Sequence, residues 1–157
     1  MMPDEGRCQS YKNPISVLVV VYTLDLEILL LERADRKGFW QSVTGSCESG
    51  EKTYETAVRE LKEETGINAN DHHLINSNMS NEFEIFKHWR GRYAPGVTHN
   101  VEHAFGLLVP GRVPIKISPR EHLQFDWVRI EEAMDRVFSW TNVDALRFLL
   151  KNHASSR

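Results

Sequence analysis

The chain has 157 residues and a formal net charge of −3 at pH 7. This length suits one domain with a substantial core, and the charge offers no general attraction for nucleic acid or for an anionic membrane. Its two cysteines make no disulfide framework, and its longest apolar run, Ile15–Tyr22, is too short to cross a bilayer. We therefore expect a cytoplasmic protein with neither a nucleic-acid nor a membrane partner.

In the first half of the chain, apolar and β-branched runs alternate with turn residues, a pattern typical of strands. The run Pro14–Tyr22 is apolar almost throughout, which predicts a strand covered on both faces and central in a sheet. Glu27–Leu31 follows as the return strand of a hairpin, and Phe39–Thr44 as a short strand. A helix is predicted over Thr53–Thr65, with Gly66 in the left-handed conformation after it.

The second half predicts a second long hairpin, a short strand and two more helices. Thr141 is expected to cap the last helix. The whole reads as one mixed α/β domain over residues 14–153, with helices on both faces of the sheet, after a flexible N-terminal segment of residues 1–13. The segments expected are, in order, a polar connection Asn68–Ser77, the hairpin Met79–Tyr93 and Val101–Val109, the strand Phe125–Val128 and the helix Ile130–Val137.

The predicted helix over Thr53–Thr65 carries its acidic residues on one stripe. Glu60, Glu63 and Glu64 lie at positions i, i+3 and i+4, which share a face at about 100° per residue. Like charges at these spacings repel by about 0.2–0.5 kcal/mol per pair. The stripe is either a solvated surface or a site for a cation. The glycine-rich turn before the helix and the neighbouring Arg59 favour the cation.

Three carboxylates within about one helical turn suit Mg²⁺, which prefers carboxylate oxygens and keeps waters that phosphate oxygens can replace. The glycine-rich turn lets backbone groups approach a metal or a phosphate closely. Arg59 can hold Glu51 or Glu60 in one rotamer through a bidentate pair. A metal bound there would polarise a phosphoryl oxygen and activate water.

This stretch resembles the Nudix box at every fixed position. It reads Gly45, five residues, Glu51, seven residues, Arg59-Glu60-Leu61, one residue, Glu63-Glu64, one residue and Gly66-Ile67. The resemblance implies an α/β/α sandwich around a mixed sheet and hydrolysis of a nucleoside diphosphate linked to another moiety. It also implies Mg²⁺, with Mn²⁺ able to substitute. The residues implied in this chemistry are Glu60 and Glu64 as metal ligands, Arg59 and Glu60 as catalytic groups, and Glu63 or its rival Glu121 as general base.

Stretches on both sides of the box are similar to a bacterial subgroup of the family that acts in folate synthesis. They are Phe39–Gly45, Phe83–Phe86 and Arg92–Thr98. The likeness implies hydrolysis of dihydroneopterin triphosphate to dihydroneopterin monophosphate and diphosphate, with Glu121 as a further metal ligand. Residues implied to bind the substrate are Lys12, Arg33, Thr44, Phe83, Glu84, Ile85, Phe86 and Ser139.

Simpler roles stay open for several of these residues. Arg33 could pair only with Asp35 or with solvent, and polar residues at the ends of elements are often just solvated. Phe83 and Phe86 have opposite parity in a strand, so at most one of them is plain core on a given face. The other could stack on a pterin or purine ring.

Two other functions also stay open. One is a broader (deoxy)nucleoside triphosphate pyrophosphohydrolase that acts on dATP or oxidised nucleotides. The other is a non-catalytic Nudix domain that senses a ligand; it predicts losses among Glu60, Glu63 and Glu64, and all three are present. The expected partner is a small-molecule triphosphate. The sequence does not decide between a monomer and a homodimer. It also leaves open the number of metal ions and which phosphorus is attacked.

Overall fold

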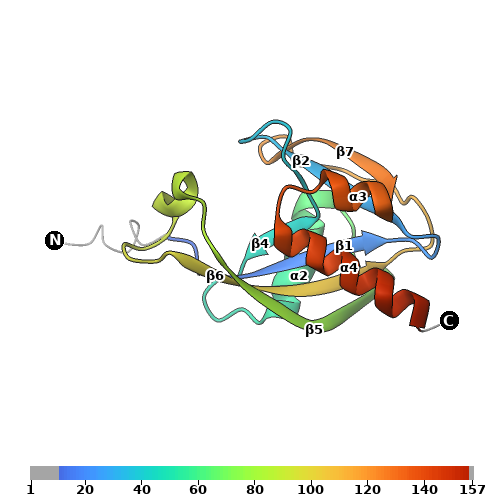
Figure 1. Ribbon diagram of the computed structural model, residues 1–157, viewed down its shortest axis with the longest axis horizontal. Coiled ribbons are helices and arrows are strands. Elements are labelled where there is room, and N and C mark those ends of the chain that lie inside the picture. The colour runs from blue at the N-terminus through green and yellow to red at the C-terminus, as the bar shows by residue number, and fades with distance from the viewer. Residues whose placement is uncertain (1–10, 156–157) are drawn as a thin grey trace.

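A seven-stranded mixed sheet runs through the computed structural model, which describes residues 11–155 (Figure 1). Strands β3, β2, β1, β6 and β5 follow one another across the sheet, while β4 also pairs with β1 and β7 with β2. The strands are β1 (Ile15–Tyr22), β2 (Glu27–Arg33), β3 (Trp40–Gln41), β4 (Val43–Ser46), β5 (His73–Glu84), β6 (His99–Leu108) and β7 (His122–Arg129). The helices are α2 (Thr53–Thr65), α3 (Ile130–Arg136) and α4 (Trp140–Ser155), with short 3₁₀ helices η1 (Ala69–Asp71) and η2 (Lys87–Arg92).

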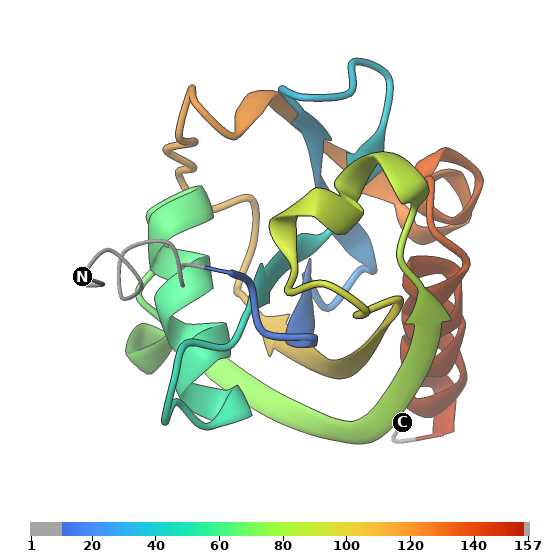
Figure 2. The ribbon, with the colours of Figure 1, turned by 90° about the vertical axis from the view of Figure 1, so that its left-hand side faces the viewer.

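Strand β1 is central, as its apolar run predicts. It pairs in parallel with β6 along its whole length and antiparallel with β2 and β4. Helix α2 covers one face of the sheet, and α3 and α4 cover the other (Figure 2). Successive residues of β1 therefore enter different cores, Val17 under α2 and Leu18 under α3 and α4. The predicted α/β class with helices on both faces is confirmed.

Helix α2 has the predicted bounds, and Gly66 follows it at φ 77°. Ala57 and Leu61 are fully buried against the sheet. Glu60 and Glu64 are buried as well, whereas Glu63 is exposed. The acidic residues therefore do not form a single solvated surface.

Two predictions of local structure are wrong. Phe39–Thr44 is not one strand: Ser42 interrupts it by donating its N–H to Asn142 Oδ1 at 2.9 Å, so β3 pairs with β2 and β4 with β1. The connection predicted over Asn68–Ser77 is largely strand, because β5 begins at His73 and pairs with β6 from there. Its polar composition reflects an edge strand, which contacts solvent on more sides than a central one.

The N-terminal segment predicted as flexible lies mostly outside the described residues. Within residues 11–13, the N–H of Lys12 donates to the carbonyl of Arg92 at 2.8 Å, and Asn13 Nδ2 donates to the carbonyl of Cys47 at 2.9 Å. The first contact joins Lys12 to the end of η2, and the second joins Asn13 to the turn between β4 and α2.

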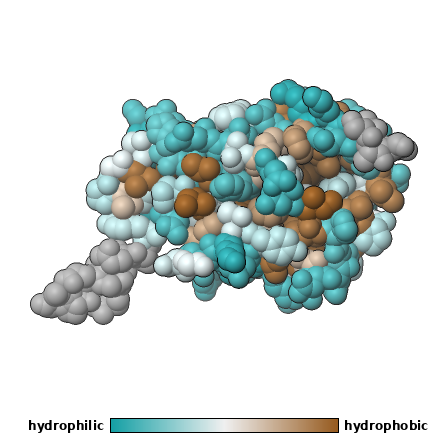
Figure 3. All heavy atoms as spheres, turned by 90° about the horizontal axis from the view of Figure 1, so that it is seen from below, coloured by the Kyte–Doolittle hydropathy of each residue, from teal (hydrophilic) through white to brown (hydrophobic). Residues whose placement is uncertain are grey.

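Two features of the surface complete the fold. No helix within residues 11–155 is long and apolar enough to cross a membrane. On the face shown in Figure 3, hydrophobic residues lie in groups between hydrophilic ones.

The face covered by α3 and α4 is open near the start of β1. Leu18 and Ala104 lie under the helices. Ser16 and Glu102, which come two residues earlier on the same face of the sheet, line a cavity. The β5–β6 ribbon carries η2 beside this opening (Figures 1 and 2).

Candidate active site

A cavity of about 380 Å³ lies where the sheet is left open. Its lining comes from all seven strands, from α2 and η2, from the start of α4 and from the loops between them. The residues predicted from the sequence that line it are Lys12, Arg33, Thr44, Glu64, Phe83, Glu84, Ile85, Phe86, Glu121 and Ser139. Arg59, Glu60 and Glu63 are not in the lining.

Glu60 and Glu64, here called the acid pair, lie one turn apart on α2 and share a hydrogen bond. Glu64 also accepts a hydrogen bond from the backbone N–H of Thr44, but its Oε1 has no hydrogen-bond partner among the described residues. Burial and then the adjacent Glu60 raise the pKa of Glu64 well above its usual range, and burial raises the pKa of Glu60 as well. A cation placed between the two carboxyl groups would favour the charged form of both.

Arg59 holds three acidic side chains at once. Its Nε and Nη2 donate to the two carboxylate oxygens of Glu51 at 2.8 and 2.9 Å. Its Nη1 donates to Glu60 Oε2 at 3.0 Å and to Glu63 Oε1 at 3.3 Å. The predicted bidentate pair is confirmed for Glu51, and Glu60 is held through the same guanidinium. Arg59 therefore orients Glu60 of the acid pair from outside the cavity.

Gly45 explains why a glycine opens the motif. A Cβ at this position would lie 2.1 Å from both Cδ and Oε2 of Glu60, where non-bonded atoms would overlap. Any other residue would force the Glu60 carboxyl away. The glycine thus gives Glu60 its place beside the cavity.

The acid pair fits a hard divalent cation. Mg²⁺ typically takes one or two carboxylates and fills its other positions with water and substrate phosphates. The two carboxyl groups of the acid pair, including the unpartnered Oε1 of Glu64, supply the carboxylate ligands. Glu121 lies in the same lining and raises the pKa of Glu64 further. Within residues 11–155, no three His, Cys, Asp or Glu side chains converge into a complete metal site.

His122 lies beside this site without supplying its missing charge. Its Nε2 is 3.8 Å from Glu64 Oε1, and both side chains are buried. Burial and then the charge of Arg33 lower the pKa of His122 to about 4. The imidazole is neutral near pH 7, so the acid pair is not neutralised by it.

Four cations, Lys12, Arg33, Arg92 and Arg120, line the cavity. Arg33 makes a bidentate pair with Asp35, with both N···O distances at 2.7 Å, and Arg92 Nη2 reaches Asp35 Oδ2 at 2.9 Å. Burial of its ammonium, then the charges of Arg92 and Arg33, lower the pKa of Lys12. The pairing with Asp35 that the sequence left open for Arg33 is present. Arg33 nevertheless lies in the lining.

Phe86, Trp89 and Phe138, here called the aromatic wall, line the cavity together. The rings of Phe86 and Trp89 are nearly parallel, with centroids 5.2 Å apart, and Phe138 meets both edge-on at 6.1 and 6.0 Å. The guanidinium of Arg33 lies over the Trp89 ring at 4.3 Å. The parity argument that separated Phe83 from Phe86 is wrong, because β5 ends before Phe86 and both residues line the cavity.

Three of the predicted binding residues have structural contacts of their own. Glu84 forms an ion pair with Arg90, and the buried Ile85 turns the chain from β5 into η2. Ser139 Oγ accepts the N–H of Asn142 at 3.2 Å and so caps α4. The prediction that Thr141 caps this helix is therefore wrong by two residues, since α4 begins at Trp140.

Among the lining residues that the sequence interpretation did not name are Trp89, Phe138, Asn100 and Glu102. The two aromatic residues come from distant segments that only the fold joins. Asn100 and Glu102 did leave a signal in the sequence. They are polar residues at alternate positions around the start of a strand predicted to be apolar.

The sheet between two helical layers, the glycine turn and the acid-bearing helix together define a Nudix domain. The family model described as NUDIX domain matches residues 12–149. The chain therefore belongs to the Nudix family, whose hydrolases generally use a divalent metal.

Curated relatives resemble the chain over most of its length. It is 44% identical over 147 residues to the dihydroneopterin triphosphate diphosphatase of Escherichia coli K12, covering 92% of this chain and 97% of that protein. It is 46% identical over 145 residues to the protein of the same name from Haemophilus influenzae, covering 90% of each. A solved structure of the E. coli dihydroneopterin triphosphate pyrophosphohydrolase matches with a TM-score of 0.86 at 44% identity, covering 92% of this chain and 99% of that one.

Proposed function

We propose that this protein hydrolyses dihydroneopterin triphosphate to dihydroneopterin monophosphate and diphosphate, using Mg²⁺ or, in its place, Mn²⁺. The observation that carries the proposal is one cavity that joins a buried carboxylate of the acid pair and four cations to an aromatic wall. A triphosphate requires positive charge, and a flat ring requires a surface to stack on. Relatives named for this activity match nearly the whole chain.

Glu60 and Glu64 would hold the metal, with Glu121 as a further ligand. Bound Mg²⁺ supplies Lewis-acid polarisation of a phosphoryl oxygen, an activated water and charge to offset that of the leaving diphosphate. Arg59 keeps Glu60 in place through its contact at 3.0 Å. Gly45 leaves the space that the Glu60 carboxyl occupies.

The cations would bind the phosphates that the metal does not reach. Arg33 has three nitrogens engaged, two with Asp35 and Nη1 with Gln41 Oε1 at 3.1 Å. Three of its five N–H groups are thereby used. Arg33 therefore acts on phosphate as a fixed charge, and two N–H groups are left that could donate to a phosphate oxygen. Lys12 and Arg92 add charge in the same lining.

Two carboxylates compete for the role of general base. Glu63 is exposed, pairs with Arg59 and lies outside the cavity lining. Glu121 lies in the lining, near Glu64. A general base must come within hydrogen-bond reach of the attacking water, so this arrangement favours Glu121 over Glu63.

The ring of the substrate would stack on the aromatic wall. Stacking of a base on an aromatic side chain contributes about 1–3 kcal/mol. The aromatic wall would suit a pterin and a purine equally, because both are flat aromatic rings. Discrimination between them must come from the ring's edge.

Product analysis with dihydroneopterin triphosphate in ¹⁸O-labelled water tests the proposal. We expect diphosphate and dihydroneopterin monophosphate, with the label showing which phosphorus is attacked. The rival function is tested by comparing kcat/KM for the pterin with the values for dATP and 8-oxo-dGTP. A preference of tenfold or more for a nucleotide would overturn the pterin assignment.

A further inference from the structure

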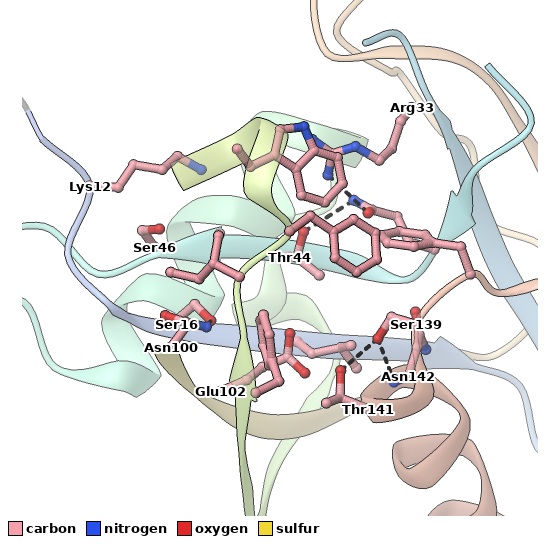
Figure 4. A pocket seen from close by; sticks show the side chains of 18 of the residues that line it. Lys12, Ser16, Arg33, Thr44, Ser46, Asn100, Glu102, Ser139, Thr141 and Asn142 are labelled. Atoms are coloured by element: carbon pink, nitrogen blue, oxygen red, sulfur yellow. Dashed lines mark hydrogen bonds between the residues drawn. The ribbon is translucent and has the colours of Figure 1, made fainter. Parts of the chain in front are cut away.

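One side of the cavity has a floor of polar side chains. Asn100 and Glu102 lie two residues apart on β6, so they share one face of the strand. Ser16 of β1 lies opposite Glu102 in the parallel register. Figure 4 shows this group and Thr141 on the side of the cavity away from Lys12 and Arg33. The floor is thus separated from the groups proposed to bind phosphate.

The hydrogen-bonding capacity of the floor is only partly used. Asn100 is 2% exposed, and its Nδ2 donates to Ser16 Oγ at 2.7 Å. Its Oδ1 has no hydrogen-bond partner among the described residues. Glu102 is also buried and is hydrogen-bonded to Thr141, but an ionised carboxylate can accept about four hydrogen bonds. The floor therefore offers acceptors that no protein group fills.

Unfilled buried acceptors select a ligand that presents donors side by side. A ring N–H next to an exocyclic amino group does so, and it can bind one carboxylate through two parallel hydrogen bonds. Pterins and guanine share this 2-amino-4-oxopyrimidine edge. Adenine has a ring acceptor beside its amino group, so an ionised carboxylate meets it with one attractive and one repulsive contact.

We propose that Asn100 and Glu102 are specificity-determining residues that read the amino and ring N–H edge of the substrate. Glu102 accepts hydrogen bonds from the ring N–H and the amino group, and Asn100 Oδ1 accepts from the amino group's second hydrogen. This inference rests on the proposed function, because it needs the ring in this cavity while the triphosphate lies at the acid pair.

The electrostatics of Glu102 agree with this role. Burial raises the pKa of Glu102 to about 7, although the hydrogen bond with Thr141 partly opposes the rise. Tyr93 is an ionisable group near Glu102: burial raises the pKa of Tyr93, and the charge of Glu102 raises it further. Donors that bind a carboxylate favour its charged form. A ring with two donors therefore supplies hydrogen bonds that stabilise the charged form of the buried Glu102.

The wild-type enzyme provides the first test. dGTP and dITP differ only in the 2-amino group, so the ratio of their kcat/KM values reports on that group alone. We expect dGTP to be preferred about tenfold or more, since a bidentate contact typically discriminates by that much. Equal values for dGTP and dITP would overturn the inference.

The second test replaces Glu102. Glu102→Gln presents an amide N–H₂ to one of the two ring donors, so we expect kcat/KM for dihydroneopterin triphosphate and dGTP to fall about tenfold to a hundredfold. The value for dATP should stay nearly unchanged. Glu82→Gln is the matched control, because Glu82 is exposed and lies on the other face of the neighbouring strand β5. An equal loss for all three substrates in Glu102→Gln would contradict the inference.

Neopterin, which carries the ring without phosphates, separates this inference from the proposed function. Its binding, followed by its own fluorescence in metal-free buffer, should weaken about tenfold or more in Glu102→Gln relative to Glu82→Gln. Unchanged binding would overturn the proposed recognition of the ring edge by Glu102, even if the triphosphate is hydrolysed. Conversely, absence of pterin triphosphate hydrolysis would refute the proposed function, and the dGTP–dITP ratio and neopterin binding would still decide the role of Glu102.

Discussion

Glu64 and Glu102 are both buried carboxyl groups in the lining of one cavity, and burial raises the pKa of each. They differ in their neighbours. Glu64 lies against Glu60 with Glu121 nearby, and these acids raise its pKa further. Glu102 is hydrogen-bonded to Thr141, which lowers its pKa in part.

In the two proposals made above, neighbours, rather than residue type or burial, select the ligand of a buried carboxyl group. Adjacent acids that repel one another can all ionise only beside a cation. A single carboxyl group among hydrogen-bonding side chains can instead be satisfied by the N–H groups of a neutral ring. One cavity can thus bind a metal with one glutamate and recognise a ring with another.

Substitution within the acid pair tests the metal half of this comparison and should have the largest effect. We expect Glu64→Gln to lower kcat about 10³-fold or more, because it removes a metal ligand. It should also abolish the rise in Tm that Mg²⁺ gives the wild-type protein. Glu60→Gln should behave in the same way. Steady-state kinetics and thermal melts with and without Mg²⁺ measure both effects.

Glu55→Gln is the control for these variants. Glu55 lies on the same helix and accepts the N–H of Lys52 at 2.9 Å, and glutamine can take that capping role. If Glu64→Gln turned over like Glu55→Gln, Glu64 would not be a metal ligand.

The buried Glu102, the carboxyl group proposed to recognise the ring, predicts a pH dependence of stability. In the unfolded chain Glu102 has its usual pKa of 4.5, whereas in the folded protein its pKa is about 7. The folded state binds more protons between these values, so its stability falls as pH rises through this window, by about 3 kcal/mol. Glu102→Gln should lose this component. Urea unfolding of both proteins at pH 5 and pH 8 measures it, and identical pH slopes would show that Glu102 titrates normally.

Gly45→Ala tests how closely the metal half is packed. The added Cβ would displace the Glu60 carboxyl, so we expect metal affinity to fall about 10- to 100-fold, as when the groups that orient a ligand are lost. Titration of activity and of Tm with Mg²⁺ measures this. Gly111→Ala is the control, because a Cβ there meets no atom within 4 Å. Equal metal affinity in both variants would show that Glu60 can move without consequence.

Arg33→Ala should have the smallest effect. It is expected to raise KM about tenfold with little change in kcat, because a fixed charge binds the triphosphate in the ground state and the transition state alike. Arg112→Ala, which removes an exposed ion pair with Glu27, is the control. A defect confined to kcat would place Arg33 at the reacting phosphorus instead.

Local periodicity was sufficient to predict much of the metal half. The bounds of α2, the left-handed Gly66 and the placement of Glu60 and Glu64 on one face follow from spacing within a single helix. The hold of Arg59 on Glu51 was also predictable, since both belong to the same short motif. Burial of the acid pair was not predictable, because it depends on how α2 lies on the sheet.

The sequence by itself therefore determined the fold class, the acid-bearing helix and the kind of chemistry, because these depend on residues close together in the chain. Only the tertiary structure decided the break at Ser42, the early start of β5 and the aromatic wall, since each depends on pairing or packing between distant segments. Glu102 belongs to the second group. On the strand it is one of several polar residues, and it gains its proposed role only because the helices leave that part of the sheet uncovered.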